Sequence, residues 1–282
     1  MKVAIILTVF NRKEKTINCL NRLYKMLLPN EVSFVTYLTD DGSSDGTSDE
    51  IRRLFPQVII TKGNGHLFWA GGMNVSWIRA IRDGGFDGYI WLNNDTFLEG
   101  NIFSVFLKAD QYAKRKYHTG GIYIGSTLSY DKTQHTYGGS IYKSKILNTL
   151  KPIIPNGNYQ ECEIGCGNIT YIDKCVVERL GTFYSGYIHG ADYDYTYWAH
   201  SCGFPVLVMP DYMGYCDNDH KSHREELIKK NLRQRIKYLY SPTGLQLKTA
   251  LLFQKRFFPY RVPYLFISYW IKTLFPFLIR KK

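Results

Sequence analysis

The order of apolar and amphipathic segments in the first half of the chain is the feature that most constrains its fold. Nearly continuous apolar runs, typical of strands buried on both faces, alternate with segments whose apolar residues recur at helical spacing. The runs lie at 2–8, 32–38, 58–61 and 88–92, and the helical segments at 13–27, 44–54, 72–82 and 101–114. Strands that alternate with helices in this way form a parallel sheet with right-handed crossovers. The sequence therefore predicts an α/β fold with a mostly parallel central sheet flanked by helices.

The rest of the chain changes character twice. Residues 119–219 begin with a stretch rich in Gly, Tyr, Thr and Ile, which predicts strands and loops before two further helices. Residues 220–282 are basic, aromatic and helical in pattern. We predict one domain at 1–219, with halves 1–118 and 119–219, and a C-terminal extension at 220–282.

The charge of the chain is concentrated in this extension. The 282 residues carry a net charge of +12, and 45% of them are hydrophobic, enough for a substantial core. From His220 onward fifteen Lys and Arg face two acids, giving +13 and leaving the first 219 residues at −1. A near-neutral body with a basic tail predicts a phosphate-bearing partner for the tail, on lipid or on nucleic acid.

The six cysteines form no CxxC pair, and their spacing does not match a zinc site. The N-terminus runs directly into a strand pattern without the features of a signal peptide. Free thiols without an export signal lead us to expect a cytoplasmic protein.

Polar residues follow three of the predicted strands where each strand ends. They occupy Thr8 to Arg12, Asp40 to Asp45, and Asn93 to Asp95. Each stretch alone is typical of an ordinary turn, but ligands of open parallel sheets bind beyond the carboxyl ends of the strands. The three stretches together therefore predict a binding site.

The sequence holds neither a Walker A lysine loop nor a GxGxxG motif to bind phosphates. A carboxylate at a strand end can instead hold a divalent cation that binds a diphosphate. Asp95, in the stretch WLNNDT, is placed for this role.

Five segments in a fixed order carry a resemblance to a known family. They read TVFN, DDGSSDGT, GNGHLFWAGGMN, WLNNDT and GADYDYTYWAHSCG. Over roughly residues 1–215 the chain resembles the inverting family 2 glycosyltransferases of the Rossmann-like GT-A fold, in particular bacterial surface-polysaccharide and rhamnosyltransferase-like enzymes. The resemblance implies a nucleotide-sugar donor and a glycan or lipid-linked glycan acceptor, with no role for nucleic acid.

The resemblance implies that residues from the first two strand ends, with one from the fourth, bind the nucleotide. The matching residues are Thr8, Phe10, Asn11, Arg12, Asp40, Asp41 and Asn94. Asp41 would accept a hydrogen bond from the imide N–H of uracil or thymine, which favours UDP or dTDP, although the base of GDP offers a comparable N–H. Asp40 could serve in place of Asp41.

The resemblance also implies a metal site and a site for the sugar and diphosphate. WLNNDT matches the DxD-type motif of the family, with asparagines at 93 and 94, so that Asp95 is the expected ligand of Mg²⁺ or Mn²⁺. His223 or His220 is a candidate for a late histidine ligand. The sugar and diphosphate are expected at Trp69, Gly71, Gly72 and Asn74.

Asp192 is the expected general base. A sugar hydroxyl is a poor nucleophile until its proton is removed, so the reaction needs such a group. GADYDYTYWAHSCG matches the acidic segment of the family, with Ala191 in place of its Glu and Asp192 retained. The alternative interpretation of Asp192 is a helix N-cap.

The stretch 247–282 mixes Lys and Arg with Phe, Tyr and Trp, and Lys272 and three prolines interrupt its apolar runs. This pattern favours helices at a membrane surface over a membrane span. We expect a peripheral protein at the inner face of the cell membrane. The alternatives are a tail that folds onto the catalytic domain and a dimer contact.

Three other functions remain open from the sequence. The basic tail and an aromatic content of 16% are compatible with nucleic-acid binding. A sugar-1-phosphate nucleotidyltransferase would have a similar sheet, but TVFNRKEK lacks the glycine-rich loop that it needs. A transferase that only binds its ligands would account for Asn94 and Ala191.

Overall fold

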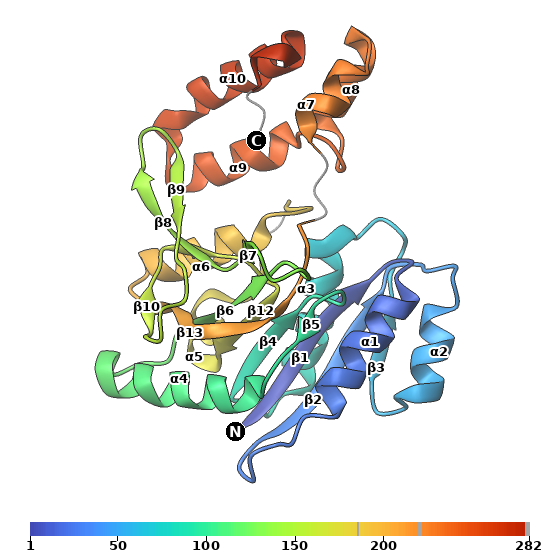
Figure 1. The fold of residues 1–282 in the computed structure, drawn as a ribbon, viewed down its shortest axis with the longest axis vertical. Coiled ribbons are helices and arrows are strands. Elements are labelled where there is room, and N and C mark those ends of the chain that lie inside the picture. Colours follow the sequence, from blue (N-terminus) through green and yellow to red (C-terminus); the bar gives the residue numbers. More distant parts are fainter. Residues whose placement is uncertain (185, 219–221, 280–282) are drawn as a thin grey trace. The chain divides into compact units, whose positions relative to one another are not determined.

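The computed structural model describes residues 1–184, 186–218 and 222–279 (Figure 1). The chain divides into two compact units. The first unit consists of Met1–Tyr184 and Gly190–Asn218, and the second contains the described residues 186–189 and 222–279. We describe each unit by itself.

The first unit contains a mixed sheet and six helices within the part of the chain that the structure describes. Its strands are β1 (Lys2–Val9), β2 (Ser33–Asp40), β3 (Ile59–Lys62), β4 (Gly88–Leu92), β5 (Phe97–Leu98), β6 (Ile122–Leu128), β7 (His135–Tyr137), β8 (Gly139–Ser144), β9 (Thr149–Pro152), β10 (Gln160–Glu161), β11 (Ile164–Gly165), β12 (Ile169–Asp173) and β13 (Val206–Tyr215). Its helices are α1 (Lys13–Tyr24), α2 (Thr47–Leu54), α3 (Phe68–Asp83), α4 (Ile102–Tyr117), α5 (Lys174–Leu180) and α6 (Ala191–Ser201).

The main sheet has the order β10-β13-β6-β12-β4-β1-β2-β3, and β5 and β7 pair at its side. β3, β2, β1 and β4 are parallel, and β13 is parallel to β6. β12 lies antiparallel between β4 and β6. The prediction of a mostly parallel sheet flanked by helices is confirmed, and β12 is the strand that brings a later segment to the carboxyl ends of β1 and β4.

Side chains of β1 alternate between two layers of the core, as expected for a strand covered on both faces. Val3, Ile5 and Leu7 join a cluster that includes Leu20 of α1 and Phe106 of α4. On the other face, aromatic side chains of α3, β4 and α6 meet at ring-centroid distances of 5.2 to 5.4 Å; they are Trp77, Trp91 and Tyr195.

Several elements are longer than the sequence predicts. β2 continues to Asp40 and β13 continues past Pro210 to Tyr215, with register shifts along the way. α3 begins at Phe68, one turn before the expected start at Gly72. The carboxylate of Asp41 accepts hydrogen bonds from N–H groups at this end of α3, which stabilises the additional turn.

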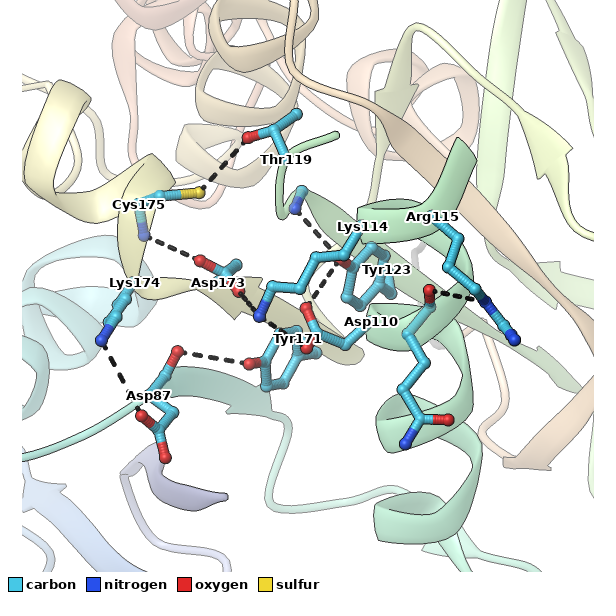
Figure 2. Close-up of polar contacts among 12 residues, drawn as sticks. Asp87, Asp110, Lys114, Arg115, Thr119, Tyr123, Tyr171, Asp173, Lys174 and Cys175 are labelled. Carbon is cyan, nitrogen blue, oxygen red and sulfur yellow. Dashed lines mark hydrogen bonds and ion pairs between the residues drawn. The ribbon is translucent and has the colours of Figure 1, made fainter. Parts of the chain in front are cut away.

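A buried polar cluster holds the opposite edge of the sheet, where β4 begins (Figure 2). Lys114 of α4 lies 2.8 Å from Asp110 and 3.2 Å from Asp173, and Tyr123 donates a hydrogen bond to Asp110. Burial raises the pKa of Asp110. At Asp173 burial acts in the same direction, but hydrogen bonds from Cys175 and the charge of Lys114 outweigh it and lower the pKa. We assign this cluster a structural role, since it connects α4, α5, β6 and β12.

The second unit is helical throughout its described secondary structure. It contains α7 (His223–Ile228), α8 (Leu232–Tyr240), α9 (Leu247–Phe257), α10 (Val262–Leu274) and the short turns η1 (Pro259–Arg261) and η2 (Pro276–Leu278). Arg261 is buried, donates a hydrogen bond to Gln254 and stacks on the ring of Phe258. Across residues 1–184, 186–218 and 222–279, no helix has the length and apolar character needed to traverse a bilayer.

Candidate active site

The candidate site lies at the edge of the sheet where the parallel strands end. Val9 of β1 pairs with Asp40 of β2, so the two loops that follow these strands begin side by side. The start of antiparallel β12 reaches the same edge, because Ile169 pairs with Leu92 at the end of β4. Three of the predicted strand ends therefore meet there, together with residues that precede β12.

Hydrogen bonds join the loop after β1 to the loop after β2. Asn11, in the left-handed conformation with a φ of 51°, accepts a hydrogen bond at Oδ1 from Ser44 N, and its own N–H donates to Ser43 Oγ. Asp40 accepts hydrogen bonds from Ser43 N and from the hydroxyl of Ser48. Phe10 is exposed. Asn11 and Asp40 thus order the loop expected to hold the nucleotide.

Asp41 points into the loop that connects β3 to α3. Its carboxylate accepts hydrogen bonds from the backbone N–H groups of Gly65 at 2.8 Å, Leu67 at 2.9 Å and Phe68 at 3.1 Å. A carboxylate offers about four lone-pair positions, so about one remains for another donor. Asp41 is 4% exposed and fixes the path of the chain leading to Trp69.

Gly72 lets α3 pack directly on β1. A Cβ at this position would lie 2.0 Å from Thr8 Oγ1, so a larger residue would push the helix away from the strand. Thr8 donates a hydrogen bond to the carbonyl of Thr39. Two turns of α3 are thereby held against the strand ends, with Gly71 beside Leu67. Asn74 follows on this helix, and its buried Oδ1 has no hydrogen-bond partner in the part of the chain that the structure describes.

Asp95 forms an ion pair with Arg12, which joins the loop after β4 to the loop after β1. The Asp95 side chain is 14% exposed. The hydroxyl of Tyr130 donates a hydrogen bond to the Asp95 carbonyl at 3.0 Å, and Cys216 Sγ lies 3.9 Å from its Oδ1. Asp95 therefore contacts residues of three other loops.

The two asparagines before Asp95 point in different directions. Asn93 accepts a hydrogen bond from the Trp69 indole at 2.8 Å, and its amide donates to Asn168 Oδ1 at 3.0 Å. Asn94 is buried and donates to Thr16 Oγ1 of α1 at 2.9 Å. The Asn94 amide is thus engaged with α1, and its expected role at the nucleotide stays a prediction.

Asp192 lies in the first turn of α6, whose N-cap residue is Gly190, so the interpretation of Asp192 as the N-cap is wrong. Its Oδ2 accepts a hydrogen bond from Gly167 N at 2.8 Å. A Cβ on Gly167 would lie 2.8 Å from the Trp69 ring and 3.4 Å from Asp192 Cβ, so the three residues are close neighbours. Burial raises the pKa of Asp192 to about 6.

Hydrogen bonds around Trp69 bring the segments that carry three of the predicted carboxylates close together. The Asp41 loop leads into Trp69, Trp69 binds the Asn93 side chain two residues before Asp95, and Gly167 beside Trp69 binds Asp192.

The role of the two candidate histidine ligands stays a prediction. His223 begins α7 in the second unit, is exposed, and places Nδ1 2.9 Å from the Tyr238 hydroxyl. His220 lies outside the described residues. Within residues 1–184, 186–218 and 222–279, no three His, Cys, Asp or Glu side chains are grouped to hold a metal ion. Asp95 could contribute a carboxylate, with the remaining ligands supplied by a bound diphosphate and water.

The sequence did not point to Gly167, Asn168, Tyr130 or Cys216 as site residues. Each reaches the site through strand pairing rather than through proximity in the sequence: β12 brings the first two beside β4, and β6 and β13 bring the others. The polar Asn168 directly before the apolar run of β12 is the signal that could have been used.

The comparisons with known proteins establish the class of fold. The chain is similar in structure to the mannosyltransferase PcManGT from Pyrobaculum calidifontis in complex with GDP-Man and Mn²⁺, with a TM-score of 0.55 and 16% sequence identity. The match covers 97% of this chain and 87% of the PcManGT chain. The chain is also similar to the crystal structure of S. aureus TarS 1–349 in complex with UDP, with a TM-score of 0.54 and 13% sequence identity. This match covers 99% of this chain and 76% of the TarS chain.

The chain therefore has the GT-A fold of these glycosyltransferases. A second structure of S. aureus TarS 1–349 agrees, with 98% of the chain and 80% of the other covered, 16% identity and a TM-score of 0.52. A scan of protein-family models and a search of curated protein sequences gave no match.

Proposed function

We propose that the protein is an inverting glycosyltransferase that moves a sugar from a nucleoside-diphosphate sugar to a hydroxyl of a glycan or lipid-linked glycan. The observation that carries the proposal is Asp192, a carboxyl with a pKa raised to about 6, held beside Trp69 at the strand-end edge of a sheet with the GT-A fold. A base with this pKa is mostly ionised at neutral pH and can still accept a proton.

The reaction follows from the chemistry of this group. Asp192 takes the proton of the acceptor hydroxyl as its oxygen bonds to the anomeric carbon from the face opposite the nucleotide. The bond from that carbon to the diphosphate oxygen breaks, and the configuration inverts. The proton ends on Asp192 and the negative charge on the nucleoside diphosphate. Trp69 would stack on the sugar, and the hydrogen bond from its indole to Asn93 supports this role because it fixes the ring.

UDP and dTDP sugars are the donors that we favour, with the loops of Asn11 and Asp41 around the base. Three of the lone-pair positions of Asp41 are occupied by backbone N–H groups, which leaves about one for an imide N–H. The structures of similar fold are in complex with GDP-Man and with UDP, so GDP sugars belong in the same test. A thermal-shift screen of nucleotide sugars with Mn²⁺, followed by assays of UDP, dTDP or GDP release, identifies the donor. Failure of every donor, with salt-sensitive binding to nucleic acid, would contradict the proposal.

Asp95 would hold the divalent ion, Mg²⁺ or Mn²⁺, together with diphosphate oxygens and water. When bound, such an ion offsets charge on a departing diphosphate. Its single carboxylate fits a site completed by the ligand, and Arg12 now supplies the positive charge beside it.

Asp95→Ala is expected to weaken nucleotide binding in the presence of Mn²⁺ by about tenfold or more, because it removes the carboxylate proposed to hold the ion. Calorimetric titration of UDP or GDP with and without Mn²⁺ measures the loss. Asp49→Ala, whose side chain is exposed on α2, is the control. Equal Mn²⁺-dependent affinity in Asp95→Ala and wild type would remove Asp95 from the metal site.

The second unit is proposed as a contact with the membrane, at the inner face of the cell membrane, where a lipid-linked acceptor would lie. α10 carries exposed apolar side chains at helical spacing, which are Tyr264, Ile267, Ile271 and Leu274, and η2 adds exposed Phe277 and Leu278. The surrounding extension carries the excess positive charge of the chain, as expected for an interfacial helix on anionic lipid.

Ile267→Ser with Ile271→Ser is expected to lower sedimentation of the protein with phosphatidylglycerol vesicles by about tenfold or more, because two apolar side chains lose their burial. Circular dichroism checks that the helices are retained. Unchanged sedimentation of this variant would reject the membrane role of α10.

A further inference from the structure

The β8–β9 hairpin of the first unit presents two adjacent apolar side chains at its tip. β8 and β9 pair from Ser140–Pro152 to Ser144–Thr149, and the turn at 145–148 closes the hairpin. Ile146 and Leu147 in this turn are 74% and 65% exposed. Gly, Asn, Asp, Pro and Ser are the usual residues of such turns. In Figure 1 the hairpin extends away from the main sheet of its unit.

The charged residues within the hairpin segment itself are basic. Residues 132–160 contain no Asp or Glu and four lysines, of which Lys143 and Lys151 are exposed on the two strands next to the tip. Lys145 is paired with Glu163 at 2.6 Å. An apolar tip between lysines is complementary to a surface with an anionic outer layer and an apolar interior, as in a bilayer of anionic lipid.

The base of the hairpin is joined to the proposed general base through β11. Gly165 of β11 pairs with Gly139 of β8, and its N–H donates to Thr196 Oγ1 of α6 at 2.9 Å. Two residues on, Gly167 N donates to Asp192. One short segment therefore fixes both the hairpin and the carboxyl group that receives the acceptor proton.

We propose that the tip of the β8–β9 hairpin inserts Ile146 and Leu147 into the interface of an anionic lipid bilayer. Lys143 and Lys151 then meet the lipid headgroups. The hairpin is a contact separate from α10, since it belongs to the other unit and to other residues. Its significance for a lipid-linked acceptor rests on the proposed function, whereas the lipid contact itself does not.

The first test measures binding of the full chain to vesicles of phosphatidylcholine and phosphatidylglycerol in equal amounts, with phosphatidylcholine alone for comparison. Ile146→Ser with Leu147→Ser is expected to lower the partition coefficient by about tenfold or more. Leu27→Ser with Leu28→Ser is the matched control, an adjacent exposed leucine pair in the same unit, and should bind as wild type does.

The second test reads the tip directly, so that binding through α10 does not conceal the result. Leu147→Cys, in a Cys202→Ser background that removes the exposed thiol, carries an environment-sensitive fluorophore. We expect its emission to shift to the blue and to be quenched by brominated lipids when anionic vesicles are added.

An unchanged probe on vesicles that bind the protein, or no vesicle binding at all, would overturn the proposal. So would a concentration-dependent blue shift without lipid, which would indicate contact between two copies of the chain. Release of nucleotide from the donor, assayed without lipid, tests the proposed function independently of these outcomes.

Discussion

Asp192→Asn is expected to lower sugar transfer by about 10²–10⁴-fold, the usual contribution of a general base. The asparagine carbonyl can still accept the hydrogen bond from Gly167 N, so the geometry beside Trp69 is retained. Donor affinity should stay within about twofold, because Asp192 acts on the acceptor hydroxyl. Turnover of the acceptor measures the loss, and calorimetry of the nucleotide measures donor affinity.

The pH dependence of transfer provides a second reading of Asp192. Burial raises its pKa to about 6, and only the ionised form can remove a proton. For the wild type, kcat/KM is therefore expected to rise with pH and to reach half its plateau near pH 6. The residual activity of Asp192→Asn should lack this rise. A wild-type profile that is flat between about pH 5 and pH 8 would contradict the assignment.

The same shift predicts the effect on stability. The fold favours the protonated form of Asp192. The contribution of this residue to the free energy of unfolding is therefore fully present below the unfolded-state pKa of 3.8 and is lost as the pH rises through about 6. The asparagine variant has no carboxylate to desolvate. Its free energy of unfolding at pH 7.5 should exceed that of the wild type by on the order of 1–3 kcal/mol, and the difference should vanish near pH 4. Urea denaturation at the two pH values checks this, and Asp49→Asn on the exposed face of α2 is the control.

Local pattern predicted the elements whose partners are adjacent in the sequence. The apolar run of β1 and the helical spacing of α1 reflect burial, because buried positions are occupied by apolar residues. The sequence around β12 predicts strands and loops but not their pairing. An antiparallel strand between β4 and β6 depends on pairing between segments that are distant in the sequence. The start of α3 was misplaced because it depends on Asp41, a residue 27 positions before Phe68.

The candidate site shows the same division. Asp95 and Asp192 could be selected from the sequence because few other groups can perform their chemistry. The sequence does not predict the direction in which a side chain points. Asn94 donates to Thr16 in α1, and Asp41 accepts from three backbone N–H groups, contacts that the sequence did not predict; the expected role of each residue at the nucleotide stays a prediction. An amide or carboxylate near a ligand is hard to distinguish by sequence from one that builds the loop around that ligand.

Asp41→Asn is expected to lower the free energy of unfolding by about 3 kcal/mol, which for a chain of this size corresponds to a fall in Tm of about 6–12 °C. Oδ1 of Asp41 accepts from Gly65, and Oδ2 accepts from Leu67 and Phe68. An asparagine has one acceptor oxygen, so its NH₂ group must face at least one of these N–H donors. The negative charge near the first turn of α3 is lost as well.

Asp40→Asn is the matched control, because Asp40 is the neighbouring residue and is equally buried, at 5% exposed against 4% for Asp41. Asp40 accepts from Ser43 N with one oxygen and from the Ser48 hydroxyl with the other. A hydroxyl can turn and accept from an asparagine NH₂, so this variant should lose less than about 1 kcal/mol. Thermal unfolding of the two variants under the same conditions compares their losses of stability. If both lose the same stability, the effect belongs to the charge of the loop and not to the three hydrogen bonds of Asp41.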